Sequence, residues 1–355
     1  MAKEPETVNN LPRLKAALRQ KQPEQLYVFY GEEIFLLNYY LGQLKKLLID
    51  DLTESFNYHK LTKETFSASA LADILEYPPM MAERTLTVVD EVDIFALPED
   101  DRKTLCRIFE DIPAYCTLIF TYETTPWDPG KQPKMNECLQ KHGVVVEFAK
   151  QERSDLIDWT LRHFAAEKKT IRRELCGYLV DITGGDMTTL SGEIVKICAY
   201  SGADEIVKSD IDAVTEPMLD VVIFHMTDAL SEGAYGTALR KLQQLQQKMQ
   251  QEEKDLKKRC TYILGMIGKH FRLIGAARIL SDHGKPATEL MKLCRAAKYP
   301  ANKAMTTAKR VSHGYCAKAM KLILETDYKM KTGYGEPDQL LELLVLQLAQ
   351  EARHA

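Results

Sequence analysis

Two adjacent carboxylates, Asp90 and Glu91, are the residues of this 355-residue sequence whose types and spacing most directly suggest chemistry. They end the apolar run 85–90, which has the composition of a buried strand. In P-loop enzymes an aspartate at such a strand end holds Mg²⁺. A neighbouring glutamate there can prepare a water molecule for attack on the terminal phosphate. The pair therefore raises the hypothesis of ATP hydrolysis.

An ATP site of this kind also needs a phosphate loop with the pattern G-x-x-x-x-G-K-[ST]. The sequence has three Gly-Lys pairs, but Gln132, His270 and Pro286 follow them, and the first glycine of the pattern is missing each time. The loop after the first apolar run reads Gly31-Glu32-Glu33, with no lysine. Carboxylates at a helix N-terminus occupy the place that phosphate would use. We therefore expect Gly31, Glu32 and Glu33 to form a degenerate, non-functional phosphate loop, and Asp90-Glu91 to be a solvated strand end.

Other catalytic and metal-binding patterns are missing as well. The tripeptide at 331–333, Lys-Thr-Gly, has no Ser-x-x-Lys nucleophile to accompany it. There is no H-E-x-x-H, no G-x-S-x-G and no Cys/His cluster at zinc spacing. The sequence therefore predicts no catalytic residue, no metal and no cofactor.

Composition narrows the class of protein. The net charge of −4 excludes a strongly basic nucleic-acid binder, although it permits local basic patches. Eight scattered cysteines without a C-x-x-C pair are typical of reduced thiols. We see no apolar leader at the N-terminus and no apolar run of about 20 residues. We therefore expect a cytoplasmic protein without a membrane contact.

The elements that would position these residues differ between the two ends of the chain. Up to about residue 150, strands alternate with helices, which favours a mainly parallel sheet covered on both faces. The predicted strands are 26–30, 85–90, 117–122 and 144–148, and the predicted helices are 34–49, 71–77 and about 100–110. From residue 151 onward we expect helices alone, with three of them in a small domain that ends near Pro217. The prediction is thus an α/β domain at 1–150, a small helical domain at 151–217 and an all-helical domain at 218–355.

This layout resembles the AAA+ clamp loaders of DNA replication. Six segments, in the right order, resemble the delta-subunit family of bacterial DNA polymerase III. They are YVFYGEEIFLL (27–37), YPPMMAERTLTVVDEVD (77–93), GYLVDITGGDMTTLSGEIVKICAY (177–200), VIFHMTDALSEGAYGTALRKLQQL (222–245), GKHFRLIGAARIL (268–280) and TDYKMKTGYGEPDQLLELLVLQL (326–348). The region 123–143 departs from the family pattern, because it lacks the usual Asp-x-Arg and has a lengthened loop.

The resemblance implies an AAA+-like domain, a lid domain and a collar domain, and a protein that binds and opens the sliding clamp without hydrolysing ATP. By resemblance, Met80 and Met81 form a hydrophobic wedge that enters a pocket on the clamp, and Pro78, Pro79 and Arg84 support it. The proline pair suits this role because it fixes φ and removes two backbone donors. From the residues alone, one or both methionines could instead pack under the domain.

The implied partners are the sliding clamp (beta subunit), the gamma/tau and delta prime subunits in a hetero-pentamer, and primed DNA. The protein would be non-catalytic itself, although it belongs to a DNA-directed DNA polymerase holoenzyme, a nucleotidyltransferase complex. Candidate DNA contacts are the basic residues Lys168, Lys169, Arg172 and Arg173 of the lid domain, and Tyr334. The plainer alternatives are a solvated helix face for the basic residues and a tyrosine that covers the end of the last helix.

Two other functions stay open on the sequence. One is an AAA+ ATPase subunit with an unconventional nucleotide site that uses Asp90-Glu91, although the lysine and the Ser/Thr of a phosphate loop are missing. The other is a delta prime subunit. Proteins of that kind usually carry a Ser-Arg-Cys finger and zinc-binding cysteines, both of which this sequence lacks.

Overall fold

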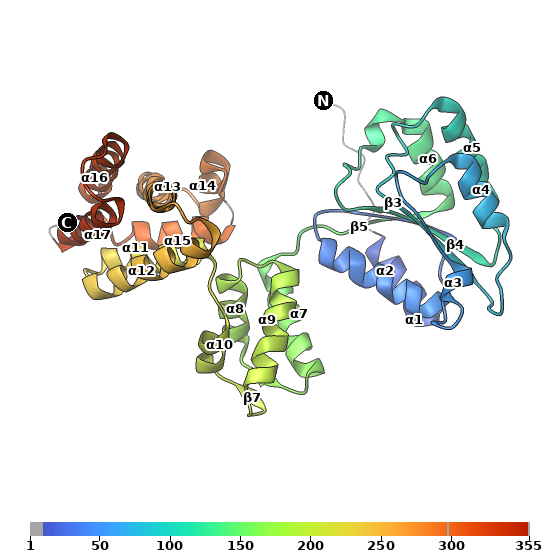
Figure 1. The fold of residues 1–355 in the computed structure, drawn as a ribbon, viewed down its shortest axis with the longest axis horizontal. Helices are drawn as coiled ribbons and strands as arrows, with labels where there is room; N and C mark the ends of the chain where they lie inside the picture. The colour runs from blue at the N-terminus through green and yellow to red at the C-terminus, as the bar shows by residue number, and fades with distance from the viewer. Residues whose placement is uncertain (1–9, 297, 354–355) are drawn as a thin grey trace. The chain divides into compact units, whose positions relative to one another are not determined.

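The computed structural model describes residues 10–296 and 298–353, and Figure 1 shows its ribbon. The chain divides into two compact units, Met1–Asp155 and Leu156–Ala355. The first contains a five-stranded sheet and the second is nearly all helical, so a mixed α/β region precedes a helical one, as predicted.

The sheet of the first unit is entirely parallel, with strand order β2-β3-β4-β1-β5. Its strands are β1 (Leu26–Tyr30), β2 (Tyr58–Leu61), β3 (Thr85–Asp90), β4 (Cys116–Tyr122) and β5 (Val144–Glu147). β1 lies inside the sheet, where Val28 is opposite Phe120 of β4 and Val145 of β5. Because helices cover both faces, successive side chains of β1, β3 and β4 are nearly all buried.

Helices cover the two faces of this sheet in separate groups (Figure 1). On one face, Leu14 of α1 and Leu37 and Leu44 of α2 pack against Phe29 and Val88. On the other face, α4, α5 and α6 pack against Val28 and other apolar strand residues. The helical elements of this unit are α1 (Leu11–Gln20), α2 (Ile34–Leu48), α3 (Glu54–Asn57), α4 (Ala68–Glu76), α5 (Glu99–Glu110), the 3₁₀ turn η1 (Pro129–Lys131) and α6 (Pro133–His142).

The sequence-based prediction of this unit is confirmed for four strands and three helices, with ends that differ by a few residues. It missed β2, whose residues Tyr58, His59 and Lys60 are only partly buried or exposed. β2 is an edge strand, so it carries no continuous apolar run that could have marked it.

The second unit consists of helices and one very small sheet. The expectation of no strand after residue 151 was wrong, because β6 (Thr170–Ile171) and β7 (Glu205–Ile206) form a parallel pair. Two-residue strands are too short for a periodic pattern. The expectation of three helices in the lid region was also wrong, because a short fourth helix, α10, follows β7. The helices are α7 (Arg153–Ala166), which starts in the last residues of the first unit, α8 (Arg173–Ile182), α9 (Met187–Tyr200), α10 (Lys208–Val214), α11 (Leu219–Ser231), α12 (Tyr235–Glu252), α13 (Leu256–Asp282), α14 (Ala287–Cys294), α15 (Lys298–Ala308), α16 (His313–Thr332) and α17 (Pro337–Arg353).

Helices α11 to α17 share one apolar core. α13 lies at its centre and packs against α12, α14, α15, α16 and α17. Ile263, Ile267 and Phe271 of α13 are almost completely buried. A helix that is apolar on most sides needs partners all round, and the neighbouring helices supply them.

Candidate functional site

An exposed methionine turn lies between helix α4 and strand β3. α4 ends at Glu76, and Pro78-Pro79 then prevents the helix from continuing. Met80 is 55% exposed and Met81 is 94% exposed. Neither methionine therefore packs under the domain, and the turn presents two adjacent apolar side chains to solvent.

The backbone of this turn is strained at Met81. Its φ is 54°, in the left-handed region, where a non-glycine residue costs about 1–2 kcal/mol. Strain of this kind persists only when the surrounding structure imposes it, and it is frequent at functional sites. The conformation that exposes Met81 is thus maintained by contacts elsewhere in the first unit.

Asn57, the last residue of α3, makes such contacts. Its side chain is completely buried. Its Oδ1 accepts a hydrogen bond from the Met80 N–H (2.8 Å), and its Nδ2 donates to the Met80 carbonyl oxygen (2.9 Å). Asn57 was not among the predicted site residues, because its partner lies 23 positions further along the chain. The only signal in the sequence is an amide between two aromatic residues, Phe56 and Tyr58.

The three residues expected to support the turn differ in their surroundings. Pro78 is exposed, Pro79 is half-buried, and Arg84 is half-buried just before β3. The guanidinium of Arg84 makes no hydrogen bond or ion pair with any described residue. A supporting role for Arg84 therefore stays a prediction.

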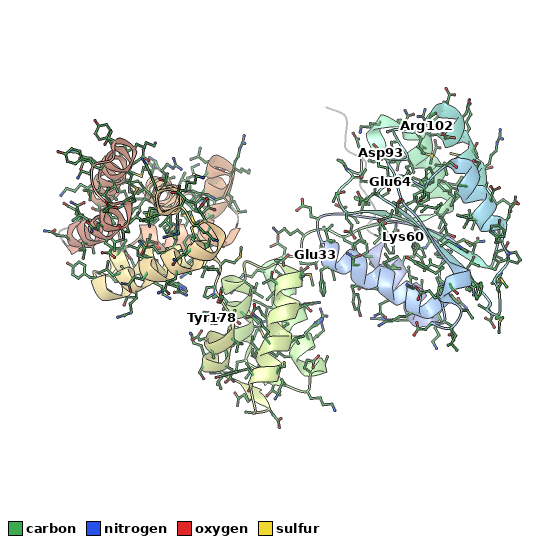
Figure 2. The ribbon with its side chains drawn as sticks, in the orientation of Figure 1. Glu33, Lys60, Glu64, Asp93, Arg102 and Tyr178 are labelled. Atoms are coloured by element: carbon green, nitrogen blue, oxygen red, sulfur yellow. The ribbon has the colours of Figure 1, made fainter. Side chains whose placement is uncertain are left out.

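The expected phosphate loop is closed by the end of strand β5. Gly31 has φ 131°, and a Cβ at this position would lie 2.3 Å from the carbonyl oxygen of Phe148. That same carbonyl accepts the Glu33 N–H at 2.9 Å, while the Phe148 N–H donates to Tyr30 at 2.7 Å. A phosphate-binding loop points its N–H groups at the ligand, but here the Glu33 N–H already has a protein partner. The side chain of Glu33, labelled in Figure 2, is buried, and that of Glu32 is exposed.

Aromatic side chains pack together at the carboxyl ends of β1 and β4. In an open α/β sheet, ligands bind outside the carboxyl ends of the strands where the winding direction reverses, here between β1 and β4. Trp127, from the lengthened loop after β4, stacks on Tyr30 with ring centroids 5.2 Å apart. It also lies 5.0 Å from the ring of Tyr122 and 4.8 Å from that of Phe95. The loop that departs from the family pattern thus packs against the ends of β1 and β4.

Asp90 and Glu91 are bound to protein groups, so the expectation of a merely solvated strand end was wrong. Asp90 forms an ion pair with Lys60 (2.8 Å; Lys60 is labelled in Figure 2) and accepts a hydrogen bond from Thr121 Oγ1 (2.8 Å). The Glu91 carboxylate accepts the backbone N–H groups of residues 123, 124 and 125 and the Thr124 hydroxyl. Burial alone would raise the pKa of Glu91, but these hydrogen bonds outweigh it and lower the pKa to about 2.

A small pocket of about 240 Å³ lies beside these two carboxylates. Its lining includes three carboxylates, Asp90, Glu91 and Glu123, against a single cation, Lys60. Its volume is below the roughly 300–1,000 Å³ usual for ligand pockets. The negative charge of the lining opposes the binding of a phosphate chain.

The basic residues of the lid region fall into two groups. Lys169 donates from Nζ to the carbonyl oxygens of Ser201 (3.1 Å) and Ala203 (2.7 Å), and Arg173 pairs with Asp158. These two cations hold parts of the second unit together. Lys168 and Arg172 are exposed. The structure therefore leaves Lys168 and Arg172 as the more accessible of the four candidate phosphate contacts.

Tyr334 lies in a tight turn between α16 and α17. Gly333 ends α16 in the left-handed conformation (φ 75°), and the Tyr334 N–H donates to the Lys329 carbonyl oxygen at 2.9 Å. The tyrosine is 78% exposed. Most of its surface therefore faces solvent and does not cover the end of the last helix.

The part of the chain that the structure describes contains neither a metal-binding cluster nor a helix that could cross a membrane. Within residues 10–296 and 298–353, no three His, Cys, Asp or Glu side chains are grouped so that they could hold a metal ion. None of the described helices combines the length and the apolar character that crossing a membrane requires.

Comparisons with known proteins agree with the fold and with the order of the segments. Residues 27–149 match the model of the family "DNA polymerase III, delta subunit", and residues 220–348 match that of its C-terminal domain. The DNA polymerase III subunit delta of Bacillus subtilis (strain 168) is 24% identical over 339 residues, covering 94% of this chain and 95% of the relative. The solved structure of the Bacillus subtilis DNA clamp loader delta protein has a TM-score of 0.62 and 21% identity, covering 95% of this chain and 99% of that one.

Proposed function

This chain belongs to the family of DNA polymerase III delta subunits, and we propose that it binds the ring-shaped sliding clamp and opens one interface of the ring, so that the clamp can be loaded onto primed DNA. In this proposal it does so without hydrolysing ATP. The contact is the methionine turn, whose side chains Met80 and Met81 enter an apolar pocket on the clamp.

The observation that carries this proposal is the exposure of Met80 and Met81 on a turn that the protein holds in a strained conformation. Leaving two large apolar side chains in water gives up the free energy that their burial would provide. Methionine also adapts to pockets of imperfect shape. A turn that is rigid in its backbone and adaptable in its side chains suits insertion into a partner.

Three features support the absence of ATP hydrolysis. The Glu33 N–H of the degenerate loop is bound to the Phe148 carbonyl oxygen, Trp127 stacks on Tyr30 just before this loop, and the neighbouring pocket is acidic. Asp90-Glu91 have structural partners that account for both carboxylates. These features disfavour the alternative of an ATPase with an unconventional site.

The remaining partners follow from the proposed role. We divide the chain into an AAA+-like clamp-binding domain (1–150), a lid domain (151–217) and a collar domain (218–355) that joins the gamma/tau and delta prime subunits in a hetero-pentamer. The collar carries exposed apolar residues that suit such assembly, among them Leu324, Tyr328, Leu343 and Leu346. Lys168 and Arg172, with Tyr334, are the proposed contacts to primed DNA. A protein of DNA replication in a bacterium would act in the cytoplasm.

The test is binding of the purified chain to its own sliding clamp, measured with and without ATP. We expect the wild type to bind equally in both conditions and the Met80→Ala/Met81→Ala variant to bind far more weakly. Leu293→Ala is a matched control, because Leu293 is 70% exposed but lies on α14 of the other unit. Binding that needs ATP, or a double variant that binds like the wild type, would refute the proposal.

A further inference from the structure

Asn57 is the polar side chain that most directly fixes the methionine turn. Its two hydrogen bonds to Met80 use both backbone groups of that residue. A third bond runs from Nδ2 to the carbonyl oxygen of Thr53 (3.2 Å). Only one orientation of the amide satisfies these partners, because a flipped amide would place its NH₂ group against the Met80 N–H.

Because the Asn57 side chain is buried, the loss of any of these hydrogen bonds would cost free energy. The side chain has no access to water, so an unmade hydrogen bond would leave an unsatisfied polar group inside the protein. The amide therefore favours the one turn conformation in which the backbone of Met80 keeps both hydrogen bonds to Asn57. The next residue, Met81, then has to adopt its left-handed backbone conformation with the side chain outward.

We propose that Asn57 is a positioning residue for clamp binding: it holds the Met80-Met81 turn ready for insertion before the partner arrives. This inference rests on the proposed function of the methionine turn. A preorganised turn avoids paying the ordering entropy on association, so its affinity is higher than that of a mobile turn with the same side chains. If the turn without Asn57 occupies the binding conformation about one-tenth of the time, the apparent affinity falls about tenfold.

The first variant is Asn57→Ala, which removes all three hydrogen bonds. The second is Asn57→Asp, nearly the same size, which keeps an acceptor for the Met80 N–H but loses both donor bonds. Leu139→Ala is the control for a general loss of stability, because Leu139 is completely buried in α6 of the same unit. Thermal unfolding is recorded for each variant, so that affinity is compared among folded proteins.

The readouts are the clamp dissociation constant and the hydrogen-exchange rate of the Met80 N–H. We expect both Asn57 variants to weaken binding about tenfold or more and to speed exchange at Met80. Leu139→Ala should leave both quantities near their wild-type values. In the Met80→Ala/Met81→Ala background, Asn57→Ala should cause no further loss of affinity, because the side chains that it positions are gone.

The single and combined variants together separate the role of Asn57 from that of the two methionines. Wild-type affinity in both Asn57 variants, while Met80→Ala/Met81→Ala loses binding, would overturn the role of Asn57 and keep the wedge. An equal loss from Asn57→Ala with and without the methionines would also overturn it, because Asn57 would then act elsewhere. Wild-type affinity in the methionine variant would refute the wedge itself, and the positioning role with it.

Discussion

The substitution Glu91→Gln tests whether the residue that looks catalytic is a structural hydrogen-bond acceptor. The Glu91 carboxylate accepts backbone N–H groups from the loop after β4 and the hydroxyl of Thr124. A glutamine would turn an NH₂ group toward these donors and would remove the negative charge. We therefore expect the first unit to be less stable and clamp binding to be unchanged.

The expected loss of unfolding free energy follows from the pKa of Glu91, which falls from 4.5 to about 2 in the folded protein. At about 1.4 kcal/mol per pKa unit this corresponds to roughly 3 kcal/mol as an upper bound. The carboxylate is partly exposed, so screening by water reduces the expected loss to about 1–2 kcal/mol. A carboxylate with a depressed pKa stabilises the fold fully above pH 4.5, and this contribution is lost as the pH falls toward 2.

The assay is urea unfolding followed by the fluorescence of Trp127, in a Trp159→Phe background that leaves Trp127 as the single tryptophan. The difference between wild type and Glu91→Gln should be constant from pH 8 to pH 5 and should narrow below pH 4.5. Equal stability of the two proteins at pH 7 would refute the structural role. ATP hydrolysis by the wild type that Glu91→Gln abolishes would favour an ATPase instead.

Three further changes test other parts of the structure. Met81→Gly should leave the unfolding free energy of the first unit within about 1 kcal/mol of the wild-type value, because relief of left-handed strain offsets the added freedom of the unfolded chain. Clamp affinity should nevertheless fall, and unchanged affinity would contradict a role for the side chain. Trp127→Ala should lower the unfolding free energy of the first unit, measured in urea, by about 2–4 kcal/mol. Calorimetry should still detect no ATP binding to this variant. ATP binding by it would contradict a closed phosphate loop. Burial of His270 lowers its pKa to about 4, although nearby Asp228 partly opposes this. Protonation of the imidazole therefore has no effect on the second unit above pH 6.5 and destabilises it as the pH falls toward 4. Unfolding followed by Trp159 fluorescence, in a Trp127→Phe background, should show a weaker acid dependence in His270→Leu, and an unchanged dependence would refute this.

Much of the first unit could be predicted because its central strands are buried on both faces. Strands such as 85–90 and 117–122 then read as continuous apolar runs, and the helices between them keep a regular apolar spacing. The edge strand β2 was missed because its residues Tyr58, His59 and Lys60 are not fully buried. The pair β6 and β7 was missed because each strand has two residues.

The site could be predicted only where neighbouring residues define it. The pattern Pro78-Pro79-Met80-Met81 marks a stiff apolar turn without knowledge of the fold. The hydrogen bonds between Asn57 and Met80 span 23 residues, and no local sequence pattern predicts such a pairing. The sequence also identified the loop after β4 as unusual, but only the packing of Trp127 against Tyr30 reveals what this loop does. Long-range hydrogen bonds and side-chain packing are therefore the parts that required the structure.

The opening of the clamp ring by the isolated chain tests the central claim most directly. Sliding clamp is first placed on a circular primed DNA, from which a closed ring cannot escape, and the purified chain is then added without ATP. We predict that clamp is released from the circle, and that the Met80→Ala/Met81→Ala variant releases it far more slowly. Clamp that stays on the circle with the wild-type chain, or that leaves only after ATP is added, would contradict a subunit that opens the ring without hydrolysing ATP.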